Sequence, residues 1–310
     1  MVMILLKIKS PFSNGLFLAY SLLSTLFMVL LHSSCSNEID YQSPEIKRRL
    51  VVYSIMQVNN DLGIYVGRTQ SLKDKDVAFV SDALVTIVDQ TTNVCDTAIL
   101  TDQDGVYVSN LPLKEGHHYS LCVEAPGFDA VYASDYIPAK VEISSATFQD
   151  PFEYSSSDAL FMGLLTLKFQ DNVAEKNYYE LLPVHRGTGS SGEVVYSRIR
   201  PFRISNEIVS VDSEAQNSPQ SILFDDHLCN GKELVLQIKI QSGGAPFIFL
   251  RNVSETYYHY QKSLYTHLYT QPENGDLMFP VEPLGLFSNI KNGFGVFSSF
   301  NQSGFQSTSK

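Results

Sequence analysis

Cys35 is the residue whose surroundings point to the most definite chemistry. Residues 16–31 form an almost unbroken apolar run, and the small residues Ser33 and Ser34 directly precede the cysteine. Small side chains let a peptidase approach the backbone, and cleavage there would leave a thiol that can be acylated. The pattern predicts a bacterial lipobox, with residues 1–34 as a signal peptide and Cys35 as the lipidated first residue of the mature chain.

An uncleaved membrane anchor is the alternative interpretation of the apolar run. The run of about sixteen residues falls just short of the roughly 20 that a transmembrane helix needs. His32 occupies a position where Leu is common in a lipobox, so the motif is imperfect. If Cys35 is acylated, each buried methylene contributes about 0.8 kcal/mol, and two or three acyl chains would attach the protein to a membrane permanently.

Two acidic clusters could supply oxygen ligands for a metal ion. The stretch TDQDG at residues 101–105 places Asp102 and Asp104 beside a glycine, and Asp225, Asp226 and His227 form a second cluster. A complete calcium loop of the helix-loop-helix kind needs further acids, including a late bidentate Glu. We therefore interpret both clusters as turns and expect no metal.

Nucleophilic catalysis finds no support in the spacing of the reactive residues. The sequence has no GxSxG elbow and no cysteine accompanied by a histidine in a recognisable setting. The loop GTGSSG at residues 187–192 is followed by no Lys-Ser or Lys-Thr pair of the kind that a phosphate-binding loop carries. We expect a protein that is not an enzyme and that uses no cofactor.

The aromatic residues favour a binding role. The chain has 17 Tyr and 19 Phe but no Trp, and tyrosines crowd the segment 254–270. Ser254 can cap this segment as a helix, Glu255 suits the first turn, and Tyr257, Gln261, Leu264 and Leu268 would share one face. One face cannot bury every tyrosine, so some could contact a partner, because Tyr combines apolar area with a hydroxyl. The candidates for this surface are Tyr258, Tyr260, Tyr265 and Tyr269.

The cysteines beyond position 35 could form one disulfide. They are Cys95, Cys122 and Cys229, an odd number in an exported protein. Cys95 and Cys122 could pair within one sheet. The alternative is three unlinked thiols, and their spacings resemble no zinc site.

Charge excludes one class of partner. The chain carries 22 basic and 33 acidic residues, a net charge of −11, and removal of residues 1–34 makes it −13 because that segment holds two lysines and no acid. Nucleic-acid binding depends on basic surface that displaces counterions. We therefore expect no nucleic-acid partner.

Short β-strands must position these residues. Apolar and polar residues alternate in segments such as 49–57, 84–88, 119–123 and 233–241, and turn residues separate them. The pattern predicts a mainly β protein with two β-sandwich-like domains, the second carrying one α-helix near residues 254–270. We expect a signal peptide at 1–34, a tether at 35–47, a first sandwich at 48–145, a serine-rich connection at 144–159, a second β-rich domain at 146–300 and a tail at 301–310.

Several sequence blocks resemble known families. VTI at 85–87, TDQDGVY at 101–107 and GHHYSLCVEAPGF at 116–128 resemble carboxypeptidase regulatory-like or transthyretin-like sandwich modules. Together with the lipobox, four later blocks resemble the lipoproteins of domain-of-unknown-function family 4249 (DUF4249) of Bacteroidetes-type bacteria. These blocks are DNVAEKNYYEL (171–181), FDDHLCNGKEL (224–234), VSETYYHYQKSL (253–264) and EPLGLFSNIKNGFGVFSSF (282–300).

The second resemblance carries functional expectations and no catalytic residues. Members of that family are often associated with TonB-dependent outer-membrane transporters, which implies a non-catalytic accessory protein that captures or presents an unknown nutrient. Acids just after a lipidated cysteine accompany export to the cell surface in such bacteria, and Glu38 and Asp40 fit that signal. We expect a lipid-anchored outer-membrane protein at the cell surface; a structural or adhesive surface module without a transporter is the alternative.

Overall fold

The computed structural model describes residues 22–25, 47–71, 74, 78–156, 159–173, 175–199, 202–204, 221–227, 229–270 and 285–310. The chain divides into two compact units, residues 1–46 and 47–310. Cys35 and nearly all of the predicted signal peptide and tether lie outside the described residues. Within those residues, no helix has both the length and the apolar composition to cross a bilayer.

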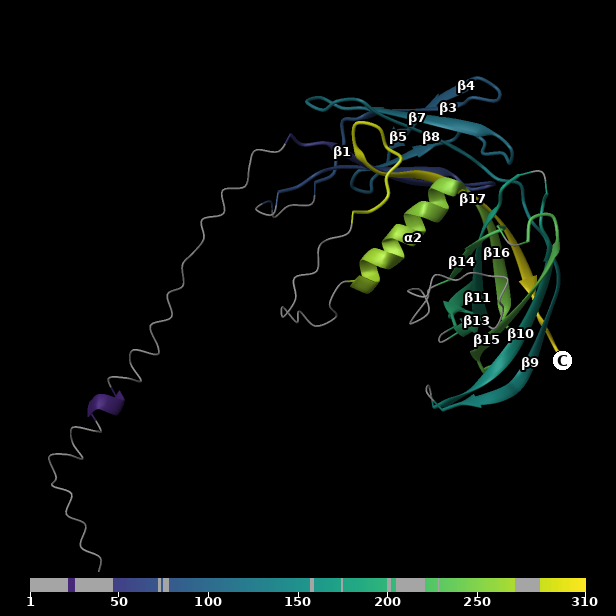
Figure 1. The fold of residues 1–310 in the computed structure, drawn as a ribbon. Coiled ribbons are helices and arrows are strands. Elements are labelled where there is room, and N and C mark those ends of the chain that lie inside the picture. The colour runs from purple at the N-terminus through teal and green to yellow at the C-terminus, as the bar shows by residue number, and fades with distance from the viewer. Residues whose placement is uncertain are drawn as a thin grey trace, which may run out of the picture. The chain divides into compact units, whose positions relative to one another are not determined.

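Three β-sheets and helix α2 (Glu255–Thr270) build the second unit (Figure 1). Sheet A runs β12 (Val194–Arg198), β11 (Tyr178–Thr188), β16 (Phe247–Val253), β17 (Phe294–Gln306), β1 (Leu50–Gln57), β2 (Leu62–Arg68), β6 (Val106–Ser109) and β5 (Ile99–Leu100), with β14 (Ile222–Asp225) paired to β11. Sheet B runs β4 (Val94–Thr97), β3 (Leu84–Asp89), β7 (His118–Glu124) and β8 (Val131–Tyr136). Sheet C runs β13 (Phe202–Ile204), β15 (Glu233–Gln241), β10 (Leu160–Gln170), β9 (Ile143–Ser155) and β18 (Thr308–Ser309).

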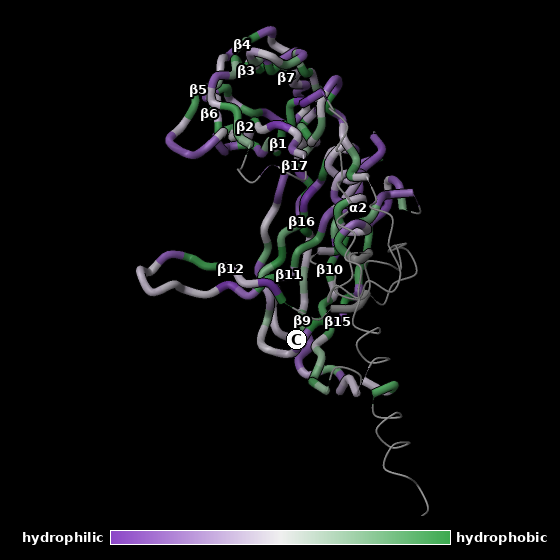
Figure 2. Tube along the Cα trace, turned by 90° about the vertical axis from the view of Figure 1, so that its left-hand side faces the viewer, coloured by the Kyte–Doolittle hydropathy of each residue, from purple (hydrophilic) through white to green (hydrophobic). Residues whose placement is uncertain are grey.

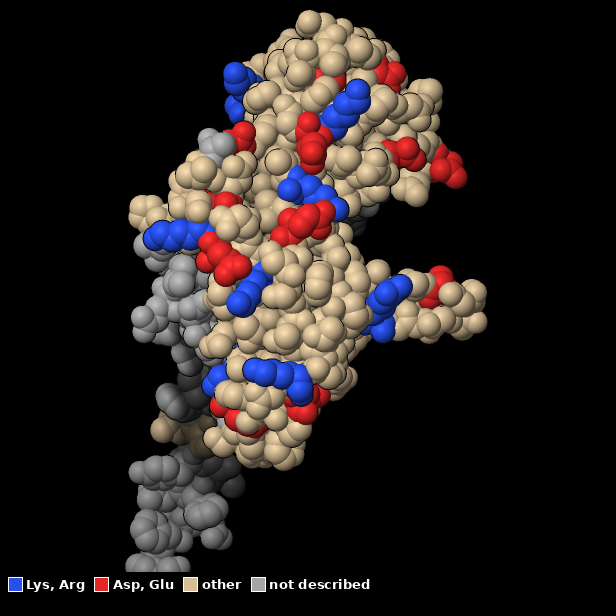
Figure 3. Space-filling model, turned by 90° about the vertical axis from the view of Figure 1, so that its right-hand side faces the viewer, with Lys and Arg blue, Asp and Glu red and all other residues tan. Residues whose placement is uncertain are grey.

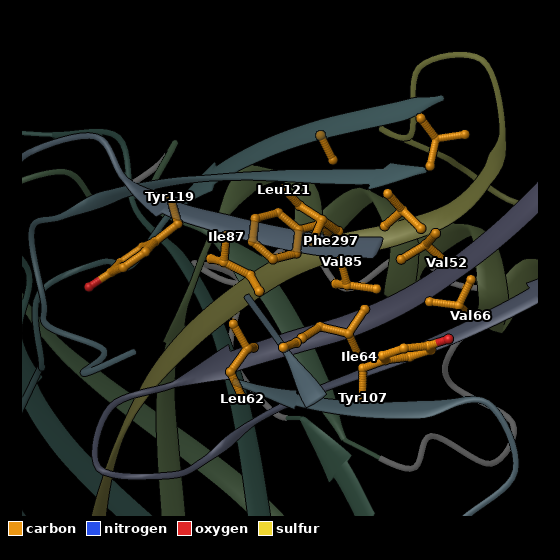
Figure 4. Close-up of a cluster of buried hydrophobic side chains, with 14 of the residues drawn as sticks. Val52, Leu62, Ile64, Val66, Val85, Ile87, Tyr107, Tyr119, Leu121 and Phe297 are labelled. Carbon is orange, nitrogen blue, oxygen red and sulfur yellow. The ribbon is translucent and has the colours of Figure 1, made fainter. Parts of the chain in front are cut away.

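The first hydrophobic core lies between sheet B and the half of sheet A that contains β1 and β2. Alternation along each strand places every second side chain inward. Val85 and Ile87 of β3 therefore meet Ile64 of β2, and Phe297 of β17 lies among them (Figure 4). The segment 49–57, which the sequence predicted to be a strand, contains β1, and β1 pairs antiparallel with β2.

The second core lies between sheet C and the half of sheet A that contains β11, β14 and β16. In β15, Leu234, Leu236, Ile238 and Ile240 point into this core, within the segment 233–241 whose alternation predicted a strand. The prediction of a mainly β protein with sandwich-like packing is confirmed. The two cores share sheet A, because β17 pairs parallel with β1 on one side and antiparallel with β16 on the other.

Helix α2 begins at the residue that the sequence predicted. The Ser254 side chain accepts a hydrogen bond from the backbone N–H of Tyr257 at 3.1 Å, so it caps the helix. Tyr257 is buried, whereas Leu268 is 51% exposed. The predicted apolar face is therefore buried near the start of the helix and exposed towards its end.

Two segments that the sequence predicted to lie outside the sheets, a connection and a tail, form strands. Residues 144–159 were expected to connect two domains, yet β9 occupies most of this stretch and pairs with β10. The expected tail contains the end of β17 and all of β18. The polar residues of β9 lie largely on its exposed side. Those of β17 are buried but have hydrogen-bond partners; for example, Asn301 Nδ2 donates to Glu115 Oε2 at 2.9 Å.

The Cys95–Cys122 disulfide is not formed. In sheet B, Cys95 of β4 pairs with Val88 of β3, while Cys122 of β7 pairs with Thr86 on the opposite side of β3. Strands lie about 4.8 Å apart, so the two Cα atoms are separated by about 10 Å, beyond the roughly 7 Å limit for a disulfide. The sequence predicted that Cys95 and Cys122 lie in one sheet, but it did not show that β3 lies between their two strands.

Candidate functional site

The candidate tyrosines of α2 do not form one continuous surface. Tyr258 packs on Tyr178 of β11 with ring centroids 4.8 Å apart, and Tyr260 packs on Tyr53 of β1 at 6.0 Å. The side chain of Tyr269 lies outside the described residues. These rings contact different strands, so they help to attach α2 to sheet A.

Tyr265 belongs to a buried polar network under the helix. Its hydroxyl lies 2.6 Å from the hydroxyl of Ser221, which donates to Glu180 Oε1 at 2.6 Å. The other oxygen of Glu180 accepts from the hydroxyl of Tyr257 and from Arg251 Nη1, each at 2.8 Å. Glu180 is thus fully engaged between β11, β16 and α2.

This Glu180 network is structural in character. Burial is the main cause that raises the pKa of Tyr265 to about 12, so the hydroxyl stays protonated at neutral pH. The guanidinium of Arg251 also lies over the ring of Phe300 at 4.3 Å. Because its hydrogen bonds are internal, the network holds α2 on sheet A and offers no reactive group to a substrate.

The two acidic clusters form turns, as predicted. Asp102 and Asp104 are exposed in the turn between β5 and β6, where Gly105 adopts φ 71°. Asp226 is buried, and its carboxylate accepts the backbone N–H of Asn177 at 2.7 Å. Across the described part of the chain, no three His, Cys, Asp or Glu side chains gather as a metal site would require.

A cavity of about 330 Å³ lies where sheet B meets β16 and the first turn of α2. This volume is at the lower end of the range for small-molecule sites. Most of its lining is polar: Gln90, His118, Ser134, Asp135, Tyr136, Pro138, Lys176, Tyr178, Asn252, Val253, Glu255 and Thr256. None of these residues was among the candidate site residues that the sequence predicted; Glu255 was assigned only to the first helical turn.

Two oxygen atoms on residues that line this cavity are buried and have no hydrogen-bond partner among the described residues. They are Oδ2 of Asp135, on β8, and Oδ1 of Asn252, on β16. Buried polar atoms without a partner are rare in folded proteins and costly. Burial raises the pKa of Asp135 to about 6, against the opposing effect of hydroxyls such as those of Ser254 and Ser299.

The wall of the cavity is aromatic and ordered by hydrogen bonds. Tyr178 donates to Glu255 Oε1 at 2.8 Å, and Lys176 places its ammonium 4.7 Å from the Tyr178 ring centroid. On the other wall, Tyr136 donates to Glu175 at 2.6 Å and stacks with His118 at 5.3 Å. The rings are therefore held in place before any ligand arrives, which lowers the entropic cost of binding.

A sequence signal for this cavity existed in the strand alternation. Val131 and Ala133 of β8 point inward, and Asp135 is the next residue of that face. Ile248 and Leu250 of β16 point inward in the same way, and they are followed by Asn252. A polar residue at the inward position where a strand ends is thus the feature that marks the site.

Fold and site together define an arrangement of three sheets in the described residues, with two sandwich-like cores and a polar cavity beside α2. The chain belongs to the DUF4249 family, described as a domain of unknown function, whose pattern matches residues 36–306. No protein with a curated description matches the sequence.

One similar solved structure is that of a DUF4785 family protein from Legionella pneumophila, with 15% sequence identity and a TM-score of 0.20. The match covers 66% of this chain and 52% of that chain, so this chain spans about half the length of that protein.

Proposed function

We propose that the protein is a lipid-anchored outer-membrane protein at the cell surface that acts, without catalysis, as a binding accessory of a TonB-dependent transporter. The observation that carries the proposal is the position of Cys35. Two serines precede it, and the family match starts at residue 36. Cleavage before Cys35 would therefore leave the whole matched region attached to a lipidated residue.

Further features support the surface location and the binding role. Glu38 and Asp40 follow the cysteine, as in surface-exported lipoproteins of Bacteroidetes-type bacteria. The preformed cavity beside α2 suits a protein that binds a ligand rather than transforms it. We also propose that residues 82–128 form a transthyretin-like module, because their sequence blocks resemble such modules.

Replacement of Cys35 tests the anchor. Cys35→Ser removes the thiol that is acylated, so we expect the protein to move from the membrane to the soluble fraction and to lose incorporation of labelled palmitate. Cys95→Ser is the matched control, because Cys95 is an exposed thiol in sheet B. Cys35→Ser protein that remains in the membrane would show that the apolar run is an uncleaved anchor and would overturn the lipobox interpretation.

The transporter partner needs a separate measurement. Affinity purification of the native lipoprotein from gently solubilised outer membrane should recover a TonB-dependent barrel protein, and Cys35→Ser should recover much less. Recovery of no barrel protein, together with unchanged nutrient uptake in a deletion strain, would contradict the accessory role.

A structural or adhesive surface module is the second candidate function. The hairpin of β11 and β12 supports it, since Val194, Val195 and Tyr196 are exposed on β12. Figure 2 shows this hairpin extending beyond the neighbouring strands, with hydrophobic residues along β12. The face in Figure 3 carries interspersed acids and bases with no patch of one sign. Binding of the purified protein to matrix glycoproteins, lost in a Tyr196→Ser variant, would favour this candidate.

A further inference from the structure

The outer edge of strand β12 has no pairing partner in the described structure. β12 ends the strand order of sheet A, so β11 is its only neighbouring strand among the described residues. The N–H of Gly189 donates to the carbonyl oxygen of Glu193 at 2.8 Å, and the pairing continues in register along β12. Main-chain groups of successive residues point to alternate sides of a strand. Val194 and Tyr196 therefore direct theirs to the outer edge, where a further strand could pair.

The hairpin of β11 and β12 leaves this edge accessible. Figure 2 shows the hairpin extending beyond the neighbouring strands, and Figure 3 shows the same projection from the opposite side. Every residue of β12 is exposed. Val195 lies opposite Gly187 of β11, where an added Cβ atom would meet nothing within 4 Å, so β11 supplies no side chain to cover the valine. The edge thus combines exposed apolar side chains with main-chain groups that can pair with another chain.

Aromatic packing holds the tyrosine of this edge in place. The ring centroid of Tyr196 lies 4.9 Å from that of Phe249 and 5.4 Å from that of Phe247, and both phenylalanines belong to β16. The guanidinium carbon of Arg186 lies over the Phe247 ring, 5.7 Å from its centroid. Tyr196 is therefore ordered before any partner binds, which lowers the entropic cost of association.

The sequence of β12 is complementary to itself. When a two-fold axis normal to the sheet relates two antiparallel strands, each residue pairs with one on the same face. An axis at Val195 sets Val195 opposite its own copy and Val194 opposite Tyr196, so apolar side chains meet on both faces. An axis one residue earlier or later would set a charged side chain, Glu193 or Arg198, opposite a valine. The register centred on Val195 is therefore favoured.

The charges at the ends of β12 agree with this register. Glu193 would lie opposite Ser197 and Arg198 opposite Gly192, so no like charges face each other. The two copies of Glu193 would be about 13 Å apart along the strands, which exceeds the Debye length of roughly 8 Å. Each Glu193 would lie one residue step from Arg198 of the other copy. This charge complementarity identifies a second copy as the occupant that fits the edge.

We propose that the β12 edge docks on the same edge of a second copy of this chain, in the antiparallel register centred on Val195. Sheet A would then continue from one copy into the other, and Val194 of each copy would exchange main-chain hydrogen bonds with Tyr196 of the other. A strand pair this short buries less than the roughly 1,600 Å² of a standard interface. We therefore expect a weak dimer, with a Kd on the order of 10–100 μM.

Sedimentation velocity of the full chain in mild detergent, from about 1 to about 300 μM, tests the inference. The protein should shift from monomer to dimer over this range. Val195→Lys sets like charges against each other at the axis, and Val194→Pro removes an N–H that β11 does not use. Each should weaken association about tenfold or more. Ile99→Lys is the matched control, because Ile99 is exposed on β5 at the other edge of sheet A, and it should leave association unchanged.

Cysteine cross-linking tests the register. In a chain whose exposed Cys95 is replaced by Ser, Val195→Cys should give a disulfide-linked dimer under mild oxidation. The two Cα atoms of a residue opposite its own copy in this register lie about 4.5 Å apart. Val194→Cys is the control, because its two copies would lie diagonally, about 8 Å apart and beyond the roughly 7 Å limit for a disulfide.

Three results would overturn the inference: a monomer at every concentration, equal weakening by Ile99→Lys and Val195→Lys, and equal cross-linking of the two cysteine variants. A monomer that binds a matrix glycoprotein through Tyr196 would also overturn it and would assign the edge to the second candidate function. The inference depends on neither the lipid anchor nor the transporter. Its failure would leave both untouched, since membrane fractionation of Cys35→Ser and recovery of a barrel protein measure them separately.

Discussion

At the scale of single residues, Asp135 is an acid in a position where its strand otherwise buries apolar side chains. It follows Val131 and Ala133 on the inward face of β8, and its Oδ2 has no hydrogen-bond partner within the described part of the chain. Burial raises its pKa from 3.8 to about 6. The folded protein therefore holds this proton more tightly than the unfolded chain does.

The raised pKa of Asp135 predicts how stability changes with pH. Between about pH 4 and pH 6 the folded state binds more protons than the unfolded state, so the free energy of unfolding falls as pH rises. The full loss, about 3 kcal/mol for a shift of roughly 2 units, is present above pH 6. Asp135→Asn should remove this contribution and give a more stable protein at pH 7.5, measured by urea unfolding.

The other titratable groups of the cavity are the same in the wild-type protein and in the Asp135→Asn variant. They are His118 on β7, Lys176 before β11, Glu255 on α2, and Tyr136 and Tyr178. The difference between the two stability curves therefore isolates Asp135. Parallel curves from pH 4 to pH 8 would contradict the prediction, and Asp102→Asn should give such a parallel curve.

At the scale of elements, the Glu180 network connects α2 to sheet A through Tyr257 and Arg251. Arg251 pairs with Glu180 at 2.8 Å, with side chains 23% and 4% exposed. Arg251→Met would leave a buried carboxylate without its cation. We expect a loss of roughly 3 kcal/mol in the free energy of unfolding, at the lower end for a buried pair because Arg251 keeps some solvent contact.

Arg48→Met provides the matched control for Arg251→Met. Arg48 pairs with Asp74 at 3.3 Å, with side chains 46% and 31% exposed. A solvent-exposed pair contributes at most about 1 kcal/mol. Chemical denaturation of both variants measures the difference, and equal losses would show that the Glu180 network does not hold α2.

Much of the element scale could be predicted from the sequence. Alternation located β7 and β15, and Ser254 marked the start of α2. The strand character of residues 144–155 could not be predicted, because β9 has serines and exposed aromatic residues where a buried strand would be apolar. Its partners along β10 and β18, rather than its own propensity, make it a strand.

The cavity could not be predicted from the sequence, because its residues come from distant parts of the chain. Asp135 and Asn252 end strands that lie far apart in the chain, in different sheets, and only the packing of those sheets against α2 brings them to one site. The sequence shows each residue only as a polar side chain at an inward position near the end of its own strand, which does not say that the two strand ends meet. To place Asp135 and Asn252 together, the sequence would have had to predict which strands pair with β8 and with β16.

At the scale of the whole folded unit, β17 is the strand on which both cores depend. It pairs with β1 on the side of the first core and with β16 on the side of the second. Gly295 makes this possible: it adopts φ 108°, and a Cβ atom there would lie 1.9 Å from the carbonyl oxygen of Val52. A Cβ atom at Gly293 would likewise lie 2.6 Å from the carbonyl oxygen of Leu50, so both glycines allow β17 to approach β1 closely.

Gly295→Ala should therefore destabilise both cores together. The added methyl clashes with backbone that cannot move without separating β17 from β1, and the residue is strained at this φ, so we expect a loss of about 3 kcal/mol or more. Gly63→Ala on β2 is the control, because a Cβ there meets nothing within 4 Å. Hydrogen exchange of β7 in the first core and β15 in the second provides the measurement. If β17 joins the cores into one cooperative unit, both strands lose protection equally in Gly295→Ala; loss confined to β7 would mean that the second core unfolds independently of the shared sheet.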